Sequence, residues 1–430
     1  MVTLSPSINA HLDRPIAVLG MGISGQSVDL LIKHLGLTCI RYDRRKDAAD
    51  QNTFSLDDAS QHGLAVCSPG FDPNHPWLEL AREAGCLCLN ELDFASLFWS
   101  KRIIGVTGTN GKTTLTEFLA FALRFMGLSA IAVGNNGRPL SSIIGQEKEE
   151  FIAVCEISSF QAESLRYCPL DALLWTNFDE DHLDRYASMR DYFVAKANLI
   201  KRLRQPLCFI GKSVSIAATY HGSSLPSFAA TVDVEEEANL PFALKGKGER
   251  IFGQVPQKEN FLLALAYWKS QQWSDAFLYE AAEHFPLPAH RLALIANHQG
   301  VCFWNDSKAT NFAATLAALK RFSSPVLWLG GGKPKGGDMN GFVQSLCKKV
   351  KRAYLFGTTA ELLARAFCAQ DISYQRVNGV KEAVSAAIAE AQPGDDVLFS
   401  PGFSSLDHFS SFAERGNTFI KAVKEAISEN

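Results

Sequence analysis

A glycine-rich segment with a single lysine, GVTGTNGKTT at residues 105–114, contains the residue types that bind phosphate groups. The apolar run KRIIGV precedes it and the amphipathic run TLTEFLAFALRFMG follows it, so we expect a strand, a loop and a helix in that order. In that geometry backbone N–H groups at the helix N-terminus bind phosphate oxygens, the lysine reaches the terminal phosphates, and the next hydroxyl binds Mg²⁺. We predict a nucleotide site formed by Gly108, Thr109, Asn110, Gly111, Lys112, Thr113 and Thr114.

This segment is a variant of the P-loop, because the strict pattern GxxxxGK[ST] requires glycine where this chain has Val106. The alternative is a glycine-rich turn with a surface lysine. The strand and helix expected on either side favour the phosphate site, since they lie where that site requires them.

Three further groups with metal-binding potential follow the loop in the sequence. Glu156 follows the apolar run FIAVC, and is interpreted either as a metal ligand at a strand tip or as a capping acid. The cluster DEDHLD at residues 179–184 follows LLWTN, and its His182 belongs either to a metal site or to a solvated loop. Mg²⁺ prefers oxygen ligands, so a histidine beside carboxylates is an unusual set. Lys196, in YFVAKANLI, is by default a lysine on a helix surface.

The last third of the chain carries two polar loops and a pair of lysines. Asp306 and Lys308 belong to NDSKATN, which follows VCFW and is either a ligand-binding loop or a helix N-cap. SPGFSSLDHFSSFAERG, at residues 400–416, is expected at the start of a helix, where backbone amides and hydroxyls suit a carboxylate. Lys333 and Lys335, in GGGKPKGGD, supply positive charge.

Strands alternate with helices along the whole chain, which predicts an α/β fold with three domains at 1–95, 96–288 and 289–430. The first domain opens with a strand over Ile16–Leu19 and a GxGxxG loop, typical of dinucleotide-binding folds but weak evidence alone. A single helix is expected over roughly Asn260–Phe285, and FPLPAH is expected to be a stiff linker. Ligands of open α/β sheets bind at the carboxyl ends of the strands, so we expect the polar clusters to converge where the domains meet.

Composition excludes several classes of protein. The chain has 430 residues with 47% hydrophobic residues, and a formal net charge of −3 argues against nucleic acid as a partner. The longest apolar region, over Phe118–Val133, is interrupted by polar residues, so no membrane span is expected. The N-terminus lacks the pattern of a signal peptide, and the ten cysteines form no CxxC pair. A cytoplasmic location is therefore expected.

With these motifs in order, the chain resembles the Mur ligases of peptidoglycan synthesis, especially their D-glutamate-adding members. The resemblance covers essentially the full length. It is carried by GTNGKTT, EISSFQ, NFDEDHLDRY, the lysine of YFVAKANLI, the pair His290 and Arg291, NDSKATN and SPGFSSLDHF.

The resemblance implies a Rossmann-like UDP-binding domain, a central P-loop ATPase domain and a C-terminal Rossmann-like domain that binds the amino acid. It implies ATP-driven amide synthesis, in which the carboxylate of UDP-MurNAc-L-alanine takes the γ-phosphate and the amine of D-glutamate attacks the acyl phosphate. Two Mg²⁺ ions are implied, with Thr113, Glu156, His182 and a carbamylated Lys196 as ligands; the carbamate would supply the missing oxygens. We expect a monomer.

The same resemblance assigns the remaining site residues. ATP would be held by Lys112 together with Asn260, Arg291, Asp306 and Lys308. The substrates would be held by Gly22, Ile23, Ser24, Asp43, Arg44, Asn135, Ser158, Lys335, Ser405, Leu406 and Phe412. The chain departs from the family at the expected HNxxN, of which Asn260 remains, and at GGKPKGG, where either Lys333 or Lys335 could face the amino acid.

Alternative functions would use fewer of the motif residues named above. An NAD-dependent oxidoreductase would use the GxGxxG loop, but it leaves the C-terminal clusters idle. A nucleotide-binding module without turnover does not require Lys112, His182 and Lys196 together. A sister ligase that adds another amino acid, or a folylpolyglutamate synthase, is nearest in type; SPGFSSLDHF favours D-glutamate by family likeness alone.

Overall fold

The computed structural model describes residues 5–68, 70–135, 137–146, 150–235, 244–253, 255–286 and 289–428, without the side chains of Lys46 and Arg250. The chain forms two compact units. The first comprises Met1–Phe178 and Arg190–Phe285, and the second comprises Asp179–Met189 and Pro286–Asn430. The expected linker FPLPAH joins them in sequence, and its Leu287 and Pro288 lie outside the described residues.

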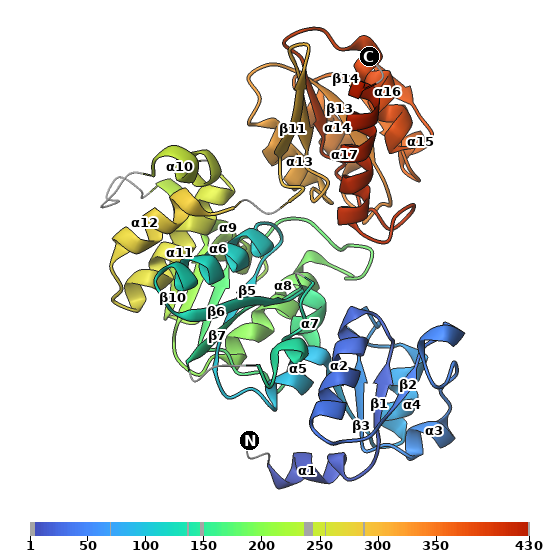
Figure 1. Ribbon diagram of the computed structural model, residues 1–430, viewed down its shortest axis with the longest axis vertical. Coiled ribbons are helices and arrows are strands. Elements are labelled where there is room, and N and C mark those ends of the chain that lie inside the picture. Colours follow the sequence, from blue (N-terminus) through green and yellow to red (C-terminus); the bar gives the residue numbers. More distant parts are fainter. Residues whose placement is uncertain are drawn as a thin grey trace. The chain divides into compact units, whose positions relative to one another are not determined.

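The first sheet is parallel, with the strand order β2-β1-β3-β4 (Figure 1). Every residue of β1 is buried, because a parallel sheet covered by helices on both faces leaves no strand face for water. The strands are β1 (Ile16–Leu19), β2 (Cys39–Tyr42), β3 (Leu64–Cys67) and β4 (Leu87–Asn90). The helices are α1 (Pro6–Leu12), α2 (Ile23–His34), η1 (Lys46–Ala48), α3 (Leu56–Ser60), α4 (Pro76–Glu83) and α5 (Glu91–Ser96).

The central sheet is also parallel, in the order β10-β9-β8-β5-β7-β6, with β5 in its interior. Its strands are β5 (Arg102–Thr107), β6 (Ser129–Gly134), β7 (Phe151–Glu156), β8 (Ala172–Trp175), β9 (Cys208–Gly211) and β10 (Ala229–Val232). Its helices are α6 (Lys112–Phe125), η2 (Leu140–Ile143), α7 (Ser159–Ser164), α8 (Met189–Ala197), η3 (Asn198–Arg202), α9 (Lys212–Tyr220), α10 (Gly246–Phe252), α11 (Gln257–Ser270) and α12 (Asp275–His284). Helix α6 starts directly after the glycine loop, as the sequence predicts.

The single helix expected over Asn260–Phe285 is wrong, because the chain turns between α11 and α12. Gln272 has a φ of 59°, a left-handed conformation that ends a helix. The turn is fixed by Trp268, whose ring lies 4.8 Å from that of Trp273 and whose Nε1–H donates to the Ser274 carbonyl. Packing of two tryptophans therefore overrides the helical periodicity.

The third sheet has the order β11-β12-β16-β13-β14-β15, in which only the β11–β12 pair is antiparallel. Trp328 of its central strand β13 is fully buried and stacks on Phe367. The strands are β11 (Ala293–His298), β12 (Val301–Asn305), β13 (Val326–Gly331), β14 (Val350–Phe356), β15 (Tyr374–Arg376) and β16 (Asp396–Phe399). The helices are α13 (Phe312–Leu319), α14 (Met339–Leu346), α15 (Ala360–Ala369), α16 (Val380–Glu390) and α17 (Phe412–Ser428).

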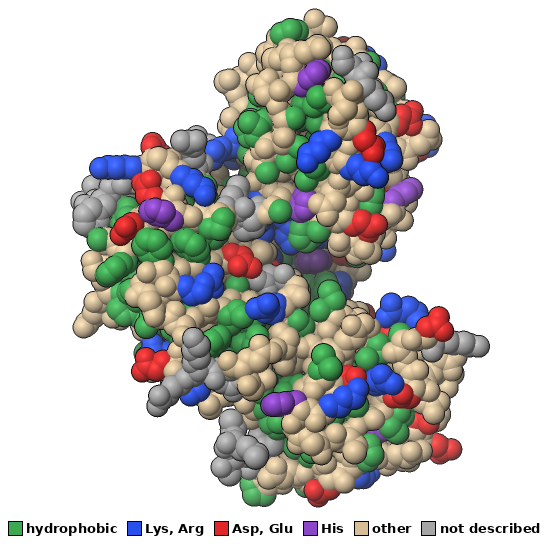
Figure 2. Space-filling view, viewed as in Figure 1, with side chains coloured by type: hydrophobic (Ala, Val, Ile, Leu, Met, Phe, Trp, Pro, Cys, Tyr) green, Lys and Arg blue, Asp and Glu red, His purple; other side chains and the backbone are tan. Residues whose placement is uncertain are grey.

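Charged side chains of both signs are interspersed over the face of the molecule in Figure 2. This distribution agrees with the small net charge of −3. Among the described helices, none is long and apolar enough to span a membrane.

Within the first unit, Asp93 of α5 is fully buried and accepts hydrogen bonds from three consecutive backbone N–H groups, those of residues 166–168, at 2.8–2.9 Å. Replacing Asp93 by Ala should lower the free energy of unfolding by about 3 kcal/mol, since it leaves buried donors without an acceptor. Urea unfolding followed by tryptophan fluorescence measures the change. Asp57→Ala, at an exposed position, is the control, and an equal loss in both variants would contradict the buried role of Asp93.

Candidate active site

The loop between β5 and α6 has the backbone shape that the phosphate-binding prediction requires. Gly108 and Gly111 have φ values of 144° and 82°, in the region that disfavours side chains. A Cβ on Gly108 would lie 1.9 Å from the hydroxyl oxygen of Thr176, and one on Gly111 would lie 2.6 Å from the amide of Asn260. Both positions are therefore closed to larger residues.

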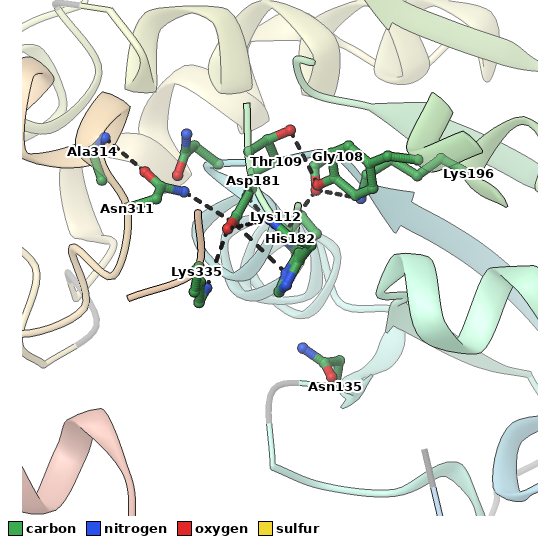
Figure 3. Close-up of polar contacts among 12 residues, drawn as sticks. Gly108, Thr109, Lys112, Asn135, Asp181, His182, Lys196, Asn311, Ala314 and Lys335 are labelled. Atoms are coloured by element: carbon green, nitrogen blue, oxygen red, sulfur yellow. Dashed lines mark hydrogen bonds and ion pairs between the residues drawn. The ribbon is translucent and has the colours of Figure 1, made fainter. Parts of the chain in front are cut away.

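Two lysines converge on one carbonyl of this loop (Figure 3). The Nζ of Lys112 donates to the carbonyl oxygens of Gly108 and Thr109 at 3.0 and 2.8 Å. The Nζ of Lys196 donates to the Gly108 carbonyl at 2.8 Å, and Lys196 is 1% exposed. The default interpretation of Lys196 as a surface lysine is therefore wrong, because α8 directs it inward against the loop.

Tyr192 completes this part of the site, and the sequence analysis missed it. Its ring lies one helical turn before Lys196, with the Lys196 ammonium 4.8 Å from the ring centre. Its hydroxyl lies 3.3 Å from the hydroxyl of Thr109. An aromatic residue four positions before a lysine was the available signal, but many helices contain that spacing.

Two residues after β8 fix the loop from the neighbouring strand, and they too were missed. The side-chain oxygen of Asn177 accepts from the backbone N–H of Asn110 at 2.8 Å, and the Thr176 hydroxyl donates to the Asn110 carbonyl at 2.6 Å. Thr113 follows Lys112 at the start of α6 and is half-buried, whereas Thr114 is fully buried. The loop is thus held from the β8 side of its strand.

Glu156 ends β7, which pairs with β5 so that Glu156 is in register with Val106. It is 1% exposed, and its Oε1 accepts from the side-chain amide of Asn135 at 3.1 Å. The strand-tip position that the sequence predicts for Glu156 is correct. Ser158 has a local role, because its hydroxyl and Gln161 form a capping box at the start of α7.

The nucleotide and metal that these residues imply can be tested against the geometry. Asn260 is fully buried beneath Gly111, and its Oδ1 has no hydrogen-bond partner among the described residues. The Glu156 carboxylate and the Thr113 hydroxyl offer the oxygen donors that Mg²⁺ prefers. The loop, its lysines and these oxygens therefore fit a nucleotide with its magnesium.

The GxGxxG loop of the first domain is tightly packed. A Cβ on Gly25 would lie 1.9 Å from the Gly20 carbonyl oxygen. Asp43 accepts from the backbone N–H of Met21 at 2.7 Å, and its hydrogen bonds with Arg45 lower its pKa to about 2. Gly22, Ile23 and Arg44 are exposed, and Ser24 is half-buried, which leaves this edge accessible.

His182 belongs to the second unit, in the segment Asp179–Met189. Its φ is 58°, and its ring nitrogen lies 3.7 Å from the Asp181 carboxylate. Within the described ranges no group of three or more His, Cys, Asp and Glu side chains forms a metal site. The predicted ligand set includes only two such residues, Glu156 and His182, so this finding does not test it.

The loop after β12 and the segment after β16 meet at a buried arginine that the sequence analysis did not single out. Arg415 is 1% exposed, and burial lowers its pKa to about 10. It donates to the hydroxyl and carbonyl of Ser307 and to the carbonyl of Phe403. Arg415 therefore fixes both loops in one arrangement.

Two of the predicted ATP-binding residues of this unit, Asp306 and Lys308, belong to the loop after β12 that Arg415 holds. Asp306 accepts from Ser400 and from the backbone N–H of Leu292, and burial of the carboxyl group raises its pKa to about 7, although the whole residue is only half-buried. The Lys308 ammonium lies 4.0 Å from the ring centre of Phe412. Arg291 is half-buried, between residues in left-handed conformations.

The helix start predicted within residues 400–416 is confirmed. Helix α17 starts at Phe412, so Ser405 and Leu406 lie in a turn before the helix rather than at its N-terminus. Ser405 is buried, and Leu406 is 62% exposed. A turn around residues 405–409 precedes the helix.

Lys333 and Lys335 have different surroundings. Lys333 is exposed, and its backbone pairs with Ser404. The Lys335 side chain is 20% exposed, and its Nζ lies 3.3 Å from the Asp181 carboxylate. Lys335 is therefore the lysine that contacts the segment containing His182.

Two family models and several relatives match this chain. The model of the Mur ligase middle domain matches residues 106–232, and that of the Mur ligase glutamate ligase domain matches residues 290–403. The UDP-N-acetylmuramoylalanine–D-glutamate ligase of Chlamydia pneumoniae is 33% identical over 95% of this chain and 98% of its own length. The ligase of that name from Desulfitobacterium hafniense (strain Y51) is 30% identical over 98% of this chain and 100% of its own length.

Solved structures show the same fold. A UDP-N-acetylmuramate–alanine ligase from Thermotoga maritima aligns with a TM-score of 0.63 at 16% identity, over 96% of this chain and all of that one. A pseudomurein peptide ligase type C from Methanothermus fervidus aligns with a TM-score of 0.61 at 16% identity, over 97% and 99%. Together with the family models and the full-length relatives, this α/β architecture of three domains places the chain in the Mur ligase family, in its D-glutamate-adding group.

Proposed function

We propose that this protein is an ATP-dependent ligase that joins D-glutamate to UDP-N-acetylmuramoyl-L-alanine in peptidoglycan precursor synthesis. The relatives of about 30% identity that span the whole chain are named for this activity. The observation that carries the proposal is the glycine loop between β5 and α6, over which Lys112 extends to the Gly108 and Thr109 carbonyls, because it builds a cationic phosphate site at the start of a helix.

The proposed reaction has two steps. A carboxylate oxygen of UDP-N-acetylmuramoyl-L-alanine attacks the γ-phosphorus of ATP, the bond to the β-phosphate oxygen breaks, and ADP leaves. The amine of D-glutamate then attacks the carbonyl carbon of the acyl phosphate, loses a proton, and phosphate leaves with the electrons of the broken C–O bond. Lys112 offsets the repulsion between the carboxylate and the triphosphate. This electrostatic effect of the lysine is strongest in a site shielded from water.

The first unit would hold the nucleotide and the UDP substrate. Residues 108–114 would bind the phosphates, and Asn260 would lie near the adenine. Gly22, Ile23, Ser24, Asp43 and Arg44 would bind the uridine diphosphate, with Asn135 and Ser158 along the substrate path. The accessible edge beside Asp43 supports this use of the GxGxxG loop.

The second unit would supply the remaining groups. Arg291, Asp306 and Lys308 would act on ATP, while Lys335, Ser405, Leu406 and Phe412 would receive D-glutamate. Because Arg415 ties the loops of both sets together, they would keep one arrangement as ligands arrive. That the two units face each other across one cleft stays a prediction.

Two magnesium ions are proposed, with Thr113, Glu156, His182 and the carbamylated Lys196 as their ligands. Bound magnesium would neutralise negative charge where the carboxylate approaches the phosphates. Carbamylation adds CO2 to the Lys196 amine with loss of two protons from the ammonium. It gives two oxygens that share one negative charge, and the carbamate nitrogen keeps one N–H that can donate to Gly108. The buried position of Lys196 beside the loop supports this assignment. We also propose that the enzyme acts in the cytoplasm as a monomer.

The choice of amino acid is tested by an assay of phosphate release with ATP, Mg²⁺ and UDP-N-acetylmuramoyl-L-alanine against a panel of D- and L-amino acids. We expect D-glutamate to give kcat/KM at least about 10²-fold above L-glutamate or L-alanine. A site that fixes both carboxylates leaves buried polar groups unpaired with L-alanine, and it places the amine of L-glutamate away from the acyl phosphate. Preference for a diamino acid or for L-alanine would identify a sister ligase. Nicotinamide-dependent absorbance without phosphate release would identify an oxidoreductase.

A further inference from the structure

Lys335 is partly covered by an acidic residue of the protein itself, Asp181. Asp181 is 8% exposed, and both of its carboxylate oxygens are bound (Figure 3). Oδ1 lies 3.3 Å from the Nζ of Lys335 and accepts from the backbone N–H of His182 at 2.9 Å. Oδ2 accepts from the Nδ2 of Asn311 at 3.2 Å and lies 3.7 Å from a ring nitrogen of His182. The Asn311 side chain is itself held, because its Oδ1 accepts from the backbone N–H of Ala314 at the start of α13. A cation and an oriented amide thus form a receptor for one carboxylate.

The backbone beside this receptor approaches the same segment closely. A Cβ on Gly336 would lie 3.1 Å from the Cβ of Leu183, and one on Gly337 would lie 2.9 Å from a carboxylate oxygen of Glu180. Both glycines have positive φ values, 83° and 102°. Segment 179–183 therefore covers the lysine loop closely.

The space between segment 179–183 and the loop that contains Lys335 is small. A pocket of about 20 Å³ lies against Lys335, Asn311 and Asp181. That volume holds about one water molecule, whereas small-molecule sites are typically about 300–1,000 Å³. This pocket beside Lys335 is therefore too small for a five-carbon dicarboxylate while Asp181 remains where it is.

We propose that the Asp181 carboxylate is an internal stand-in for a carboxylate of the incoming amino acid, which must displace it from Lys335 and Asn311. This inference rests on the proposed function, in which Lys335 receives D-glutamate. The two carboxylates are chemically equivalent ligands for one ammonium and one amide, so they compete. Displacement also frees the segment that contains His182, and so it links the arrival of the amino acid to that residue.

The competition predicts the direction of a kinetic change. Replacing Asp181 by Asn keeps the shape but removes the charge, and a neutral amide competes poorly with a carboxylate for Lys335. KM for D-glutamate should fall about three- to ten-fold, with KM for ATP unchanged. If Asp181 instead positions Lys335 for the substrate, its loss should raise KM for D-glutamate. The matched control is Asp184→Asn, the same charge change at an exposed position in the same segment.

Direct binding keeps the test independent of turnover. Isothermal titration of D-glutamate into the Asp181→Asn protein should give a Kd about three- to ten-fold below that of the wild type, and a Kd equal to or above the wild-type value overturns the inference. An unchanged or raised KM in the variant, with a wild type that uses D-glutamate, also overturns it and leaves the proposed function intact. A wild type that releases no phosphate with D-glutamate instead refutes the proposed function.

Discussion

Replacing Lys112 by Ala should reduce phosphate release at least about 10³-fold, equivalent to about 4 kcal/mol of transition-state stabilisation. The side chain extends from the first residue of α6 back over the loop, where its Nζ contacts the Gly108 and Thr109 carbonyls. Phosphate oxygens bound at this loop would meet the same ammonium. Since the charge on the transferred group is not neutralised without it, the loss should appear in kcat as well as in KM.

Single-turnover phosphate release with saturating ATP and both other substrates measures this effect. Lys247→Ala, at an exposed position of the same unit, is the control and should retain full activity. Circular dichroism before the assay excludes unfolding as the cause. Near-normal ATP consumption by Lys112→Ala would refute the assigned role, and would return the loop to the interpretation of a glycine-rich turn.

The local motifs were predictable because the residues that form the local strand, loop and helix lie in the same short stretch of chain as the polar residues of the site. The strand, loop and helix around Lys112 follow from residues 101–126 alone, and the structure has them as β5, the loop and α6. The strand tip at Glu156 follows similarly from the apolar run before it. In each case periodicity and the position of one polar residue were sufficient.

The residues that the sequence analysis missed act over long chain separations. Asn177 is 67 positions from Asn110 in the sequence, and Arg415 is 108 positions from Ser307, yet the residues of each pair are hydrogen-bonded to each other. No local pattern marks such residues, since their roles exist only after the strands have paired. The break before α12 has the same origin, because two tryptophans decide it by packing.

Lys196 is buried against the glycine loop, so its removal should have a large effect on activity. Replacing it by Ala should reduce phosphate release about 10²-fold or more, or about 3 kcal/mol, if the carbamate is a magnesium ligand. The truncated side chain leaves a buried space beside the Gly108 carbonyl and the Tyr192 ring. Acetate or formate could enter that space and return carboxylate oxygens, so activity should partly recover as either acid is added.

The recovery distinguishes a carbamate from a plain ammonium. If Lys196 acts as a cation that neutralises phosphate, added methylamine should restore Lys196→Ala and carboxylic acids should not, whereas the carbamate predicts the reverse. Lys201→Ala, at an exposed position just after α8, controls for effects of the acids on the assay. Lys196→Arg keeps a cation but cannot form the lysine carbamate, and it should remain as inactive as the alanine variant. Full activity of Lys196→Arg would therefore contradict the carbamate, because the remaining positive charge alone would then suffice.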